Sequence, residues 1–363
     1  MIEQVLINNY KSIRDLKLSL NRLNVMIGSN GAGKSNFISF FELTKAIYEQ
    51  RLGSYTLFKG GIDTLLHNGR KASPSIKGLL DFNNNNAFFF EIRPTHGNKG
   101  YIEETGDFQN TNHTECKDYK NKWNRTRWDS AVEESSLIEN PKAGYLKKYL
   151  NSFTIYHFHD TSESSPMRGD CNINDNEFLR DNGSNLAACL YTIMQNDIKT
   201  FRLIEGVIRS IAPYFKGFKL RTDSINGERI RLEWMEKDTD MYLNGYSFSD
   251  GTLRFIALTT LLLQTNMPEV IIIDEPELGL HPAAINKLAE LIKNASRKSQ
   301  IIISTQSTNL VNCFETDDII VVDRKDGQSV FTHLSGDELE TWMNDYNLSI
   351  SDMWEKNMIG GQL

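Results

Sequence analysis

The sequence has few cysteines and no long apolar run, and these two absences argue against whole classes of protein. Its four cysteines lie far apart, without a C-x-x-C pair, which argues against a disulfide framework or a zinc ribbon. Charged residues interrupt the N-terminal segment, and no window approaches roughly 18 uninterrupted apolar residues, so we expect neither a signal peptide nor a membrane span. A protein of the reducing cytoplasm fits this pattern.

Glycine, proline and charge of one sign are also scarce. The chain has 24 glycines and 8 prolines, too few for a composition dominated by linkers. Its 40 basic and 47 acidic side chains leave a net charge of −7, which argues against a protein that coats nucleic acid by bulk charge. With 363 residues, 39% of them hydrophobic, we expect an ordered body of about two domains, or one large domain with an insertion.

The clearest motif is a glycine loop at residues 28–35, G-S-N-G-A-G-K-S, which matches G-x-x-x-x-G-K-[ST] in full. Apolar residues over 23–27 predict a strand before it, and we expect this strand to share one sheet with strands near Val5 and Leu18. Apolar residues over 37–47 recur at helical spacing after it. A strand, a glycine loop and a helix in this order predict a site for a nucleoside triphosphate. The alternative is a glycine-rich turn without a ligand.

The residue types of the loop suggest separate roles in phosphate binding. Glycine allows backbone N–H groups at a helix N-terminus to approach phosphate oxygens. Lys34 is expected to reach the β and γ phosphates, and the Ser35 hydroxyl to ligate Mg²⁺. The remaining predicted contacts with the nucleotide are Ser29, Asn30, Gly31, Ala32, Gly33 and Asn36.

Two carboxylates follow an all-apolar strand expected over 270–273. Because ligands bind beyond the carboxyl ends of strands in open α/β sheets, Asp274 and Glu275 are candidates for the same site. We expect Asp274 to hold Mg²⁺ through its water shell, and Glu275 to polarise the attacking water. The alternative is an acidic loop after a core strand, without a catalytic role.

The order of elements predicts an α/β fold. Apolar strands expected over 270–273, 301–303 and 319–322 alternate with a helix over 282–297, which is typical of a wound sheet. Residues 75–103 are expected to form antiparallel strands instead.

Three motifs together resemble the ATP-binding-cassette (ABC) heads of RecF, SMC and OLD-type proteins. The glycine loop and Asp274-Glu275 are similar to their Walker A and Walker B motifs, and Ser249-Asp250-Gly251 stands where their L-S-G-G-Q signature lies. Residues 277–282 look like their D-loop. The resemblance is specific over residues 1–50 and 245–325. It includes stand-alone predicted ATPases of bacteria, often encoded near restriction or phage-defence genes.

The resemblance implies a P-loop NTPase of ABC head type, with a mixed sheet, an antiparallel first lobe and a helical second lobe. It also implies hydrolysis of ATP with Mg²⁺ by a homodimer, because in such heads the signature of one subunit completes the ATP site of the other. Ser249, Asp250 and Gly251 would then bind the γ-phosphate in trans. The alternative is that Ser249 or Asp250 only caps the following helix.

Two positions depart from the family pattern. Gln306 stands where the family usually has a switch histidine, and a neutral amide donates a hydrogen bond without carrying positive charge, which is consistent with slow turnover. No Q-loop glutamine is evident, and His159 is its substitute by position. His157 and His159 alternate onto one face of a strand, so a metal site and a polar pocket wall are both open.

The chain is expected to form a single head over 1–363 with recognisable parts. These are a polar helical insertion at 107–150, a second lobe at 151–250, the Walker B, D-loop and switch half at 251–335, and a tail at 336–363. Because only about 40 residues follow Asp323, no fused nuclease module is expected, and an effector would be a separate chain.

Three functional hypotheses follow. The first is an ATP-gated sensor or scaffold that controls a partner effector, a nuclease or toxin, in anti-phage defence. The second is a DNA-binding clamp of RecF or SMC type. Its candidate surface is the basic stretch 117–127 with Trp123 and Trp128, although a solvated helix with inward tryptophans is also open. The third is a scaffold that binds ATP but barely cleaves it.

Overall fold

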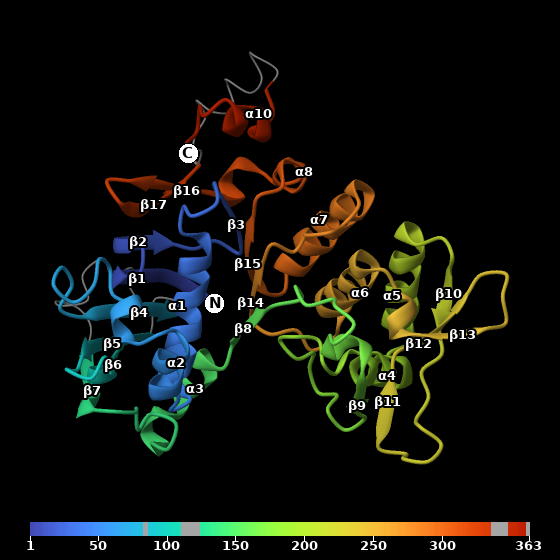
Figure 1. Ribbon diagram of the computed structural model, residues 1–363, viewed down its shortest axis with the longest axis horizontal. Coiled ribbons are helices and arrows are strands. Elements are labelled where there is room, and N and C mark those ends of the chain that lie inside the picture. Colours follow the sequence, from blue (N-terminus) through green and yellow to red (C-terminus); the bar gives the residue numbers. More distant parts are fainter. Residues whose placement is uncertain (83–85, 110–123, 335–347, 361–363) are drawn as a thin grey trace. The chain divides into compact units, whose positions relative to one another are not determined.

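The computed structural model in Figure 1 describes residues 1–82, 86–109, 124–334 and 348–360. The chain divides into two compact units. Unit 1 comprises residues 1–153 and 315–363, and unit 2 comprises residues 154–314. Among the described residues, no helix combines the length and apolar character needed to cross a membrane.

Unit 1 contains a six-stranded sheet in which all neighbouring strands are antiparallel. In spatial order its strands are β2 (Ile13–Ser19), β1 (Ile2–Tyr10), β4 (Ile76–Phe82), β5 (Asn86–Pro94), β6 (Gly100–Gln109) and β7 (Asn124–Val132). The antiparallel first lobe is therefore confirmed. Residues 83–85, between β4 and β5, lie outside the described residues.

Helix α1 (Lys34–Tyr48) packs against this sheet through aromatic side chains. The Phe40 ring lies 5.8 Å from Tyr10 of β1 and 5.6 Å from Phe90 of β5, measured between centroids, and all three side chains are buried. Figure 1 shows α1 running beside the strands. This packing fixes the helix whose first turn follows the glycine loop.

Strand β3 (Leu23–Ile27) does not join the sheet of β1 and β2, so the expectation of one sheet was wrong. It pairs in parallel with β16 (Ile319–Lys325), which pairs with antiparallel β17 (Gln328–His333). The reason is visible in burial, because all five residues of β3 are buried, as in a parallel strand covered on both faces. Strand β2 alternates buried and exposed residues instead.

Among its described residues, the polar helical insertion expected at 107–150 is helical only over 141–150. Strand β7 occupies 124–132, and Arg125 and Arg127 both pair with Glu104 of β6. Basic and less polar residues alternate along this stretch with the period of a strand, which explains the difference. Lys117, Lys120 and Trp123 lie outside the described residues.

The remaining described helical elements of unit 1 are α2 (Leu52–Phe58), η1 (Ile62–Thr64), η2 (Pro141–Ala143), α3 (Gly144–Leu150), η5 (Thr316–Asp318) and α10 (Ile350–Glu355).

Unit 2 combines a buried parallel strand pair with a group of helices. Strands β14 (Val270–Asp274) and β15 (Gln300–Thr305) pair in parallel, joined by α7 (Pro282–Ser296), and β8 (Phe153–Tyr156) is the strand next to β14. The other helical elements are η3 (Pro166–Arg168), α4 (Leu186–Asn196), α5 (Ile198–Ile211), η4 (Gly245–Ser247), α6 (Asp250–Leu263) and α8 (Thr308–Val311). The strands and helices expected here are confirmed.

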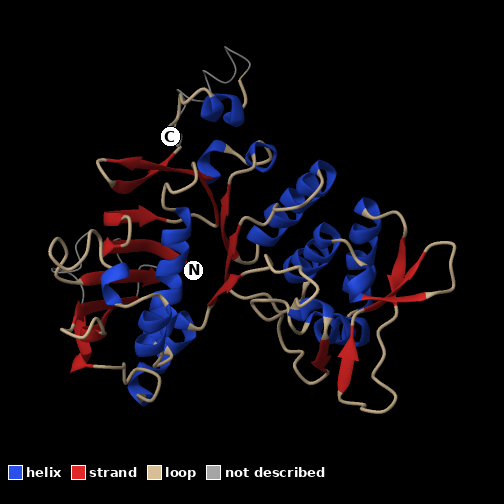
Figure 2. Ribbon diagram, in the orientation of Figure 1, coloured by secondary structure: helices blue, strands red, loops and turns tan. Residues whose placement is uncertain are grey.

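Two small sheets complete unit 2. Their strands are β9 (Asp170–Asn172) with β11 (Arg229–Arg231), and β10 (Phe215–Phe218) with β12 (Glu233–Glu236) and β13 (Tyr242–Asn244). Figure 2 shows how short these strands are beside the helices α4, α5, α6 and α7. A largely helical second unit agrees with the resemblance.

Candidate active site

The glycine loop (residues 28–35) connects β3 to α1 in unit 1. The Lys34 side chain is buried, and its Nζ donates hydrogen bonds to the carbonyl oxygens of Gly28, at 2.5 Å, and Ser29, at 3.2 Å. Helix α1 begins after Gly33 without a side-chain cap. The N–H groups of its first turn therefore suit an anion such as a phosphate.

The loop is braced from β17. Gly33 has φ +122°, and a Cβ at this position would overlap Ser329 Oγ. Ser329 hydrogen-bonds to the carbonyl oxygen of Ala32, at 2.5 Å, and to the Ser12 hydroxyl, at 2.6 Å. Asn36 also donates to Ser12 Oγ, at 2.7 Å, so its side chain supports the loop. Among the other predicted nucleotide contacts, Ser29 is half-buried, whereas Asn30, Gly31 and Ser35 are exposed.

The two predicted carboxylates lie at the end of β14 in unit 2. Asp274 pairs in register with Ser304 of β15, whose hydroxyl donates to the Asp274 carboxylate. Glu275 has φ +42°, a conformation that is costly for a residue with a side chain. Its N–H donates to the Ser304 carbonyl at 2.8 Å, and its carboxylate accepts from the side-chain amide of Gln306. The fold brings Asp274, Glu275 and Gln306 together at the end of β14, where the sequence analysis expected the first two.

A third carboxylate, Glu277, organises the same edge. The Thr305 hydroxyl and the Gln306 N–H donate to Glu277 Oε1 at 2.5 Å and 3.2 Å. Burial raises the pKa of Glu277 above its ordinary value, and the hydrogen bond from Thr305 opposes this shift. Glu277 thus fixes the backbone of Gln306, whose side chain contacts Glu275.

The signature turn (residues 245–251) leads into α6; Gly245 and Phe248 are buried, and Tyr246, Ser247, Ser249 and Asp250 are exposed. Ser249 caps the helix, because its Oγ accepts from the Thr252 N–H at 3.3 Å, and both Ser249 and Asp250 are exposed. The cap is therefore observed, and the role in trans stays a prediction. A Cβ on Gly251 would come within 2.5 Å of the Gly279 carbonyl oxygen. Glycine at this position lets α6 pack closely on the loop after Glu275.

Two buried arginines, which the sequence analysis missed, hold these loops. Arg168 donates to the carbonyl oxygens of Gly245, at 2.7 Å, and Phe248, at 3.0 Å, and pairs with Asp250 at 2.8 Å. Arg254 of α6 is only 5% exposed. An available signal for Arg254 was a lone charge inside an otherwise apolar helix; we find no comparable signal for Arg168.

Arg254 joins three segments of unit 2. It donates to the carbonyl oxygens of Phe158, at 2.8 Å, and His159, at 2.9 Å, and to that of Leu278. The guanidinium therefore ties α6 to the segment after β8 and to the loop after Glu275.

His159 lies within electrostatic reach of Asp274 and Glu275. Burial lowers the pKa of His159, and the negative charge of Asp274 opposes this shift. The imidazole is therefore neutral at pH 7 and suits a hydrogen bond better than a charge interaction. Over the described ranges, no group of three or more metal-ligating side chains includes His157 or His159.

The residues present fit ATP and Mg²⁺. The uncapped start of α1 and the close-packed Gly33 form a cradle suited to phosphates. The Ser35 hydroxyl and the Asp274 carboxylate are oxygen ligands of the kind that Mg²⁺ prefers. When bound, Mg²⁺ would neutralise charge on the phosphates.

Replacing Arg254 with methionine keeps most of the apolar stem and removes the guanidinium. We expect Arg254→Met to lower the free energy of unfolding by about 3 kcal/mol, because the buried Phe158 carbonyl and the partly buried carbonyls of His159 and Leu278 lose a charged donor. Urea unfolding followed by circular dichroism measures this change. Arg202→Met, on an exposed position of α5, is the matched control and should change stability by less than about 0.5 kcal/mol. Equal unfolding midpoints for the two variants would contradict the assignment.

Comparisons with known proteins agree with this geometry. A family model described as "AAA domain, putative AbiEii toxin, Type IV TA system" matches residues 23–312, which include the glycine loop, the signature turn and Gln306. No curated protein is similar enough in sequence to count as a relative.

Two solved structures show the fold. An Smc head bound to the C-winged helix domain of ScpA has a TM-score of 0.62 at 17% identity, over 94% of this chain and 99% of that one. An Smc head domain bound to the C-terminal domain of ScpA, derived from Pyrococcus furiosus, has a TM-score of 0.54 at 15% identity, over 96% and 99%. The resemblance to SMC heads is thus confirmed for the fold, and the chain belongs to the AAA domain family of the AbiEii type.

Proposed function

We propose that this chain hydrolyses ATP with Mg²⁺ as a homodimer and acts as an ATP-gated sensor or scaffold for a partner effector. The observation that carries the ATPase part is the strained Glu275, held by Ser304 and Gln306 at the end of β14. Such strain persists only where the surroundings enforce it, and it is common at active sites.

Each residue has a defined role in the proposed reaction. Water attacks the γ-phosphorus, and the bond to the bridging oxygen of ADP breaks. Glu275 orients the water through its carboxylate, and Gln306 holds that carboxylate in place. Lys34 exchanges its carbonyl partners for phosphate oxygens and stabilises their charge. Ser35 and Asp274 would each offer an oxygen ligand to Mg²⁺, which would neutralise phosphate charge.

The exposed signature turn supports the dimer. Ser249 and Asp250 face solvent at the start of a 14-residue helix, where the helix dipole favours an anion. Arg168 fixes the turn from behind, through Gly245, Phe248 and Asp250. In the proposed dimer, the start of α6 in one copy completes the ATP site of the other copy. This role requires a helix start that is both exposed and held in place.

Glu275→Gln tests the catalytic role. We expect turnover to fall by about 100-fold or more with ATP affinity retained, because a neutral amide cannot polarise the water as a carboxylate does. Phosphate release and ATP binding measure the two effects. The matched control is Glu290→Gln at an exposed position of α7, which should leave turnover unchanged. Unchanged hydrolysis by Glu275→Gln, with Lys34→Ala protein showing that no contaminating ATPase is present, rules out this assignment.

Ser249→Arg tests the dimer. In a Glu275→Gln background, where ATP is retained, we expect ATP-dependent dimers that disappear when Ser249 is also replaced by arginine. Arginine at this exposed position removes the cap of α6 but none of its buried contacts, and it places a bulky side chain at the proposed interface. Sedimentation velocity with and without ATP gives the mass. Ser224→Arg, in an exposed loop of unit 2, is the control and should still dimerise. Dimers of equal strength in both variants would refute the trans role of the signature turn.

The proposed sensor role is supported by the matched family and by the structures of similar fold. The matched family carries the names of a toxin and of a toxin–antitoxin system, and two structures of similar fold hold a domain of a partner protein, ScpA. By analogy, a separate effector such as a nuclease or toxin would bind this chain in one nucleotide state.

Native mass spectrometry tests this role. We expect protein purified together with the products of neighbouring genes to carry a companion in fixed ratio, and ATP to change that ratio. Glu275→Gln protein should hold the ATP-bound ratio. If the chain carries no companion in either nucleotide state, the sensor role fails while the ATPase assignment stands.

The alternative function, a DNA-binding clamp, has weaker support. Arg125 and Arg127, the described members of the basic stretch, are both engaged by Glu104. DNA binding that depends on ATP and weakens steeply with salt would favour the clamp.

A further inference from the structure

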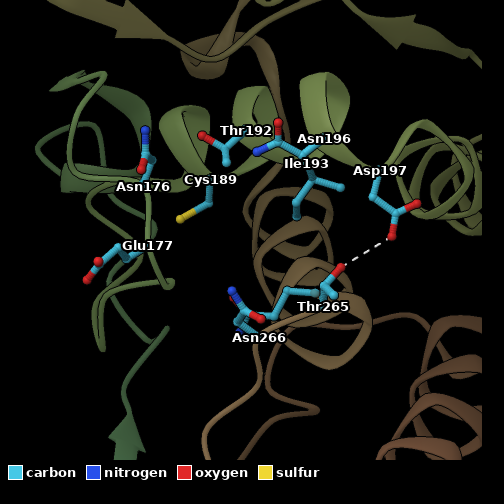
Figure 3. Close-up of a pocket in the computed structure, with 10 residues that line it drawn as sticks. Asn176, Glu177, Cys189, Thr192, Ile193, Asn196, Asp197, Thr265 and Asn266 are labelled. Atoms are coloured by element: carbon cyan, nitrogen blue, oxygen red, sulfur yellow. Dashed lines mark hydrogen bonds between the residues drawn. The ribbon is translucent and has the colours of Figure 1, made fainter.

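We propose that unit 2 contains a second ligand site, separate from the ATP site, for an uncharged nucleoside. The site is a pocket of about 470 Å³ formed by α4, the loop before it and the segment that follows α6. Figure 3 shows Asn176 and Glu177 on one side, Thr192 and Ile193 of α4 above, and Asn266 opposite. This volume lies within the range of small-molecule sites, roughly 300 to 1,000 Å³. The inference does not depend on ATP hydrolysis.

The observation that points to a ligand is an unpartnered donor in the wall. Gln264 lines the pocket and is only 6% exposed. Its Oε1 accepts from the Leu179 N–H at 3.4 Å, and the opposite amide orientation would place two donors face to face. The orientation is therefore fixed, and Nε2 is left buried without a hydrogen-bond partner among the described residues. Because Nε2 itself is almost fully covered, a ligand with a carbonyl or ring-nitrogen acceptor would satisfy this donor once the Gln264 side chain turns toward the pocket that it lines.

The other walls define the class of ligand. None of the residues that line the pocket is lysine or arginine, which disfavours phosphate groups. Asn176, Asn196 and Asn266 add three carboxamides, each with a donor and an acceptor. Paired donors and acceptors of this kind match the edges of nucleobases, as in the pairing of asparagine or glutamine with adenine.

Apolar and structural groups complete the pocket. Ile193 and the buried Cys189 offer an apolar surface for the face of a ring. Burial raises the pKa of the Cys189 thiol to about 12, so this side chain is neutral and is not a nucleophile at pH 7. Asp197 is already engaged, because its carboxylate accepts from Thr200 and from the Thr265 hydroxyl, at 3.2 Å. An uncharged base with its sugar toward the open rim fits these walls better than a nucleotide.

Calorimetry with adenosine, guanosine, cytidine and uridine as separate probes tests the site. The full chain is first saturated with a non-hydrolysable ATP analogue, so that the glycine loop is occupied. We expect at least one nucleoside to bind, and Gln264→Leu to weaken its binding by about tenfold or more, through loss of one buried hydrogen bond. Leucine is close to glutamine in shape, but it removes both the unpaired donor and the acceptor of the Leu179 N–H, so a thermal melt must show that the variant is folded at the assay temperature. Gln195→Leu, on an exposed position of α4 outside the pocket, is the matched control and should bind like the parent.

Four results would overturn the proposal. The first is no binding of any of the four nucleosides at millimolar concentration. The second is equal binding by the parent and by Gln264→Leu. The third is a crystal structure, soaked with the best-binding probe, in which only water contacts Gln264 Nε2. Tighter binding of the 5′-monophosphate than of the nucleoside would refute the uncharged class of ligand.

Discussion

One buried guanidinium, that of Arg254, determines how the parts of the unit 2 site are held together. It lies on α6, and it hydrogen-bonds to backbone carbonyls of the segment after β8 and of the loop after Glu275. A charge that is only 5% exposed is costly unless fully hydrogen-bonded, so these segments cannot separate freely from α6. Gly251 tightens the same contact, because its missing Cβ lets α6 approach Gly279. The start of α6 and the loop that carries Glu275 are thus joined by direct contacts.

The second constraint is the local strain at Glu275. A left-handed backbone costs roughly 1 to 3 kcal/mol for a residue with a side chain. The hydrogen bonds to Ser304 and from Gln306 offset this cost and leave the carboxylate in one orientation. Glu277 extends the arrangement, since it holds the Gln306 backbone from the buried side. The strained backbone of Glu275 thus lowers stability, while its hydrogen bonds fix the carboxylate. Both features are consistent with the proposed role of orienting a water molecule.

Local patterns predicted the elements that carry the site. The all-apolar runs at β14 and β15, and the helical spacing after the glycine loop, each determine an element from neighbouring residues alone. Which sheet a strand joins was harder to predict. The residues of β3 indicate a strand, but they do not indicate its partner β16, which lies almost 300 residues later. The prediction of a helical segment where β7 lies was wrong for a different reason. Its alternation of arginines with less polar residues is short, and the surrounding polar composition suggested a helix.

The residues that the sequence could not reveal act through the backbone. Arg168 and Arg254 bond mainly to carbonyl oxygens, which every residue offers, so no partner side chain marks them in the sequence. Gln264 is similar, because its importance comes from a burial and an unpaired Nε2 that only the folded unit creates. A sequence motif identifies, from the types of its side chains, the groups that contact a ligand. It does not identify the other residues that hold those groups in position.

Gln306 makes the proposed dimer more important than it would be with a histidine at this position. A glutamine amide donates to the Glu275 carboxylate, but it brings no positive charge toward a γ-phosphate. The charge that develops in the transition state then depends on Lys34, Mg²⁺ and the positive end of α6 from the second copy. Because α6 is tied through Arg254 to the loop of its own Glu275, closing the dimer would both supply the missing positive potential and steady the catalytic carboxylate. Hydrolysis in this chain should therefore be slow in the monomer and coupled to assembly.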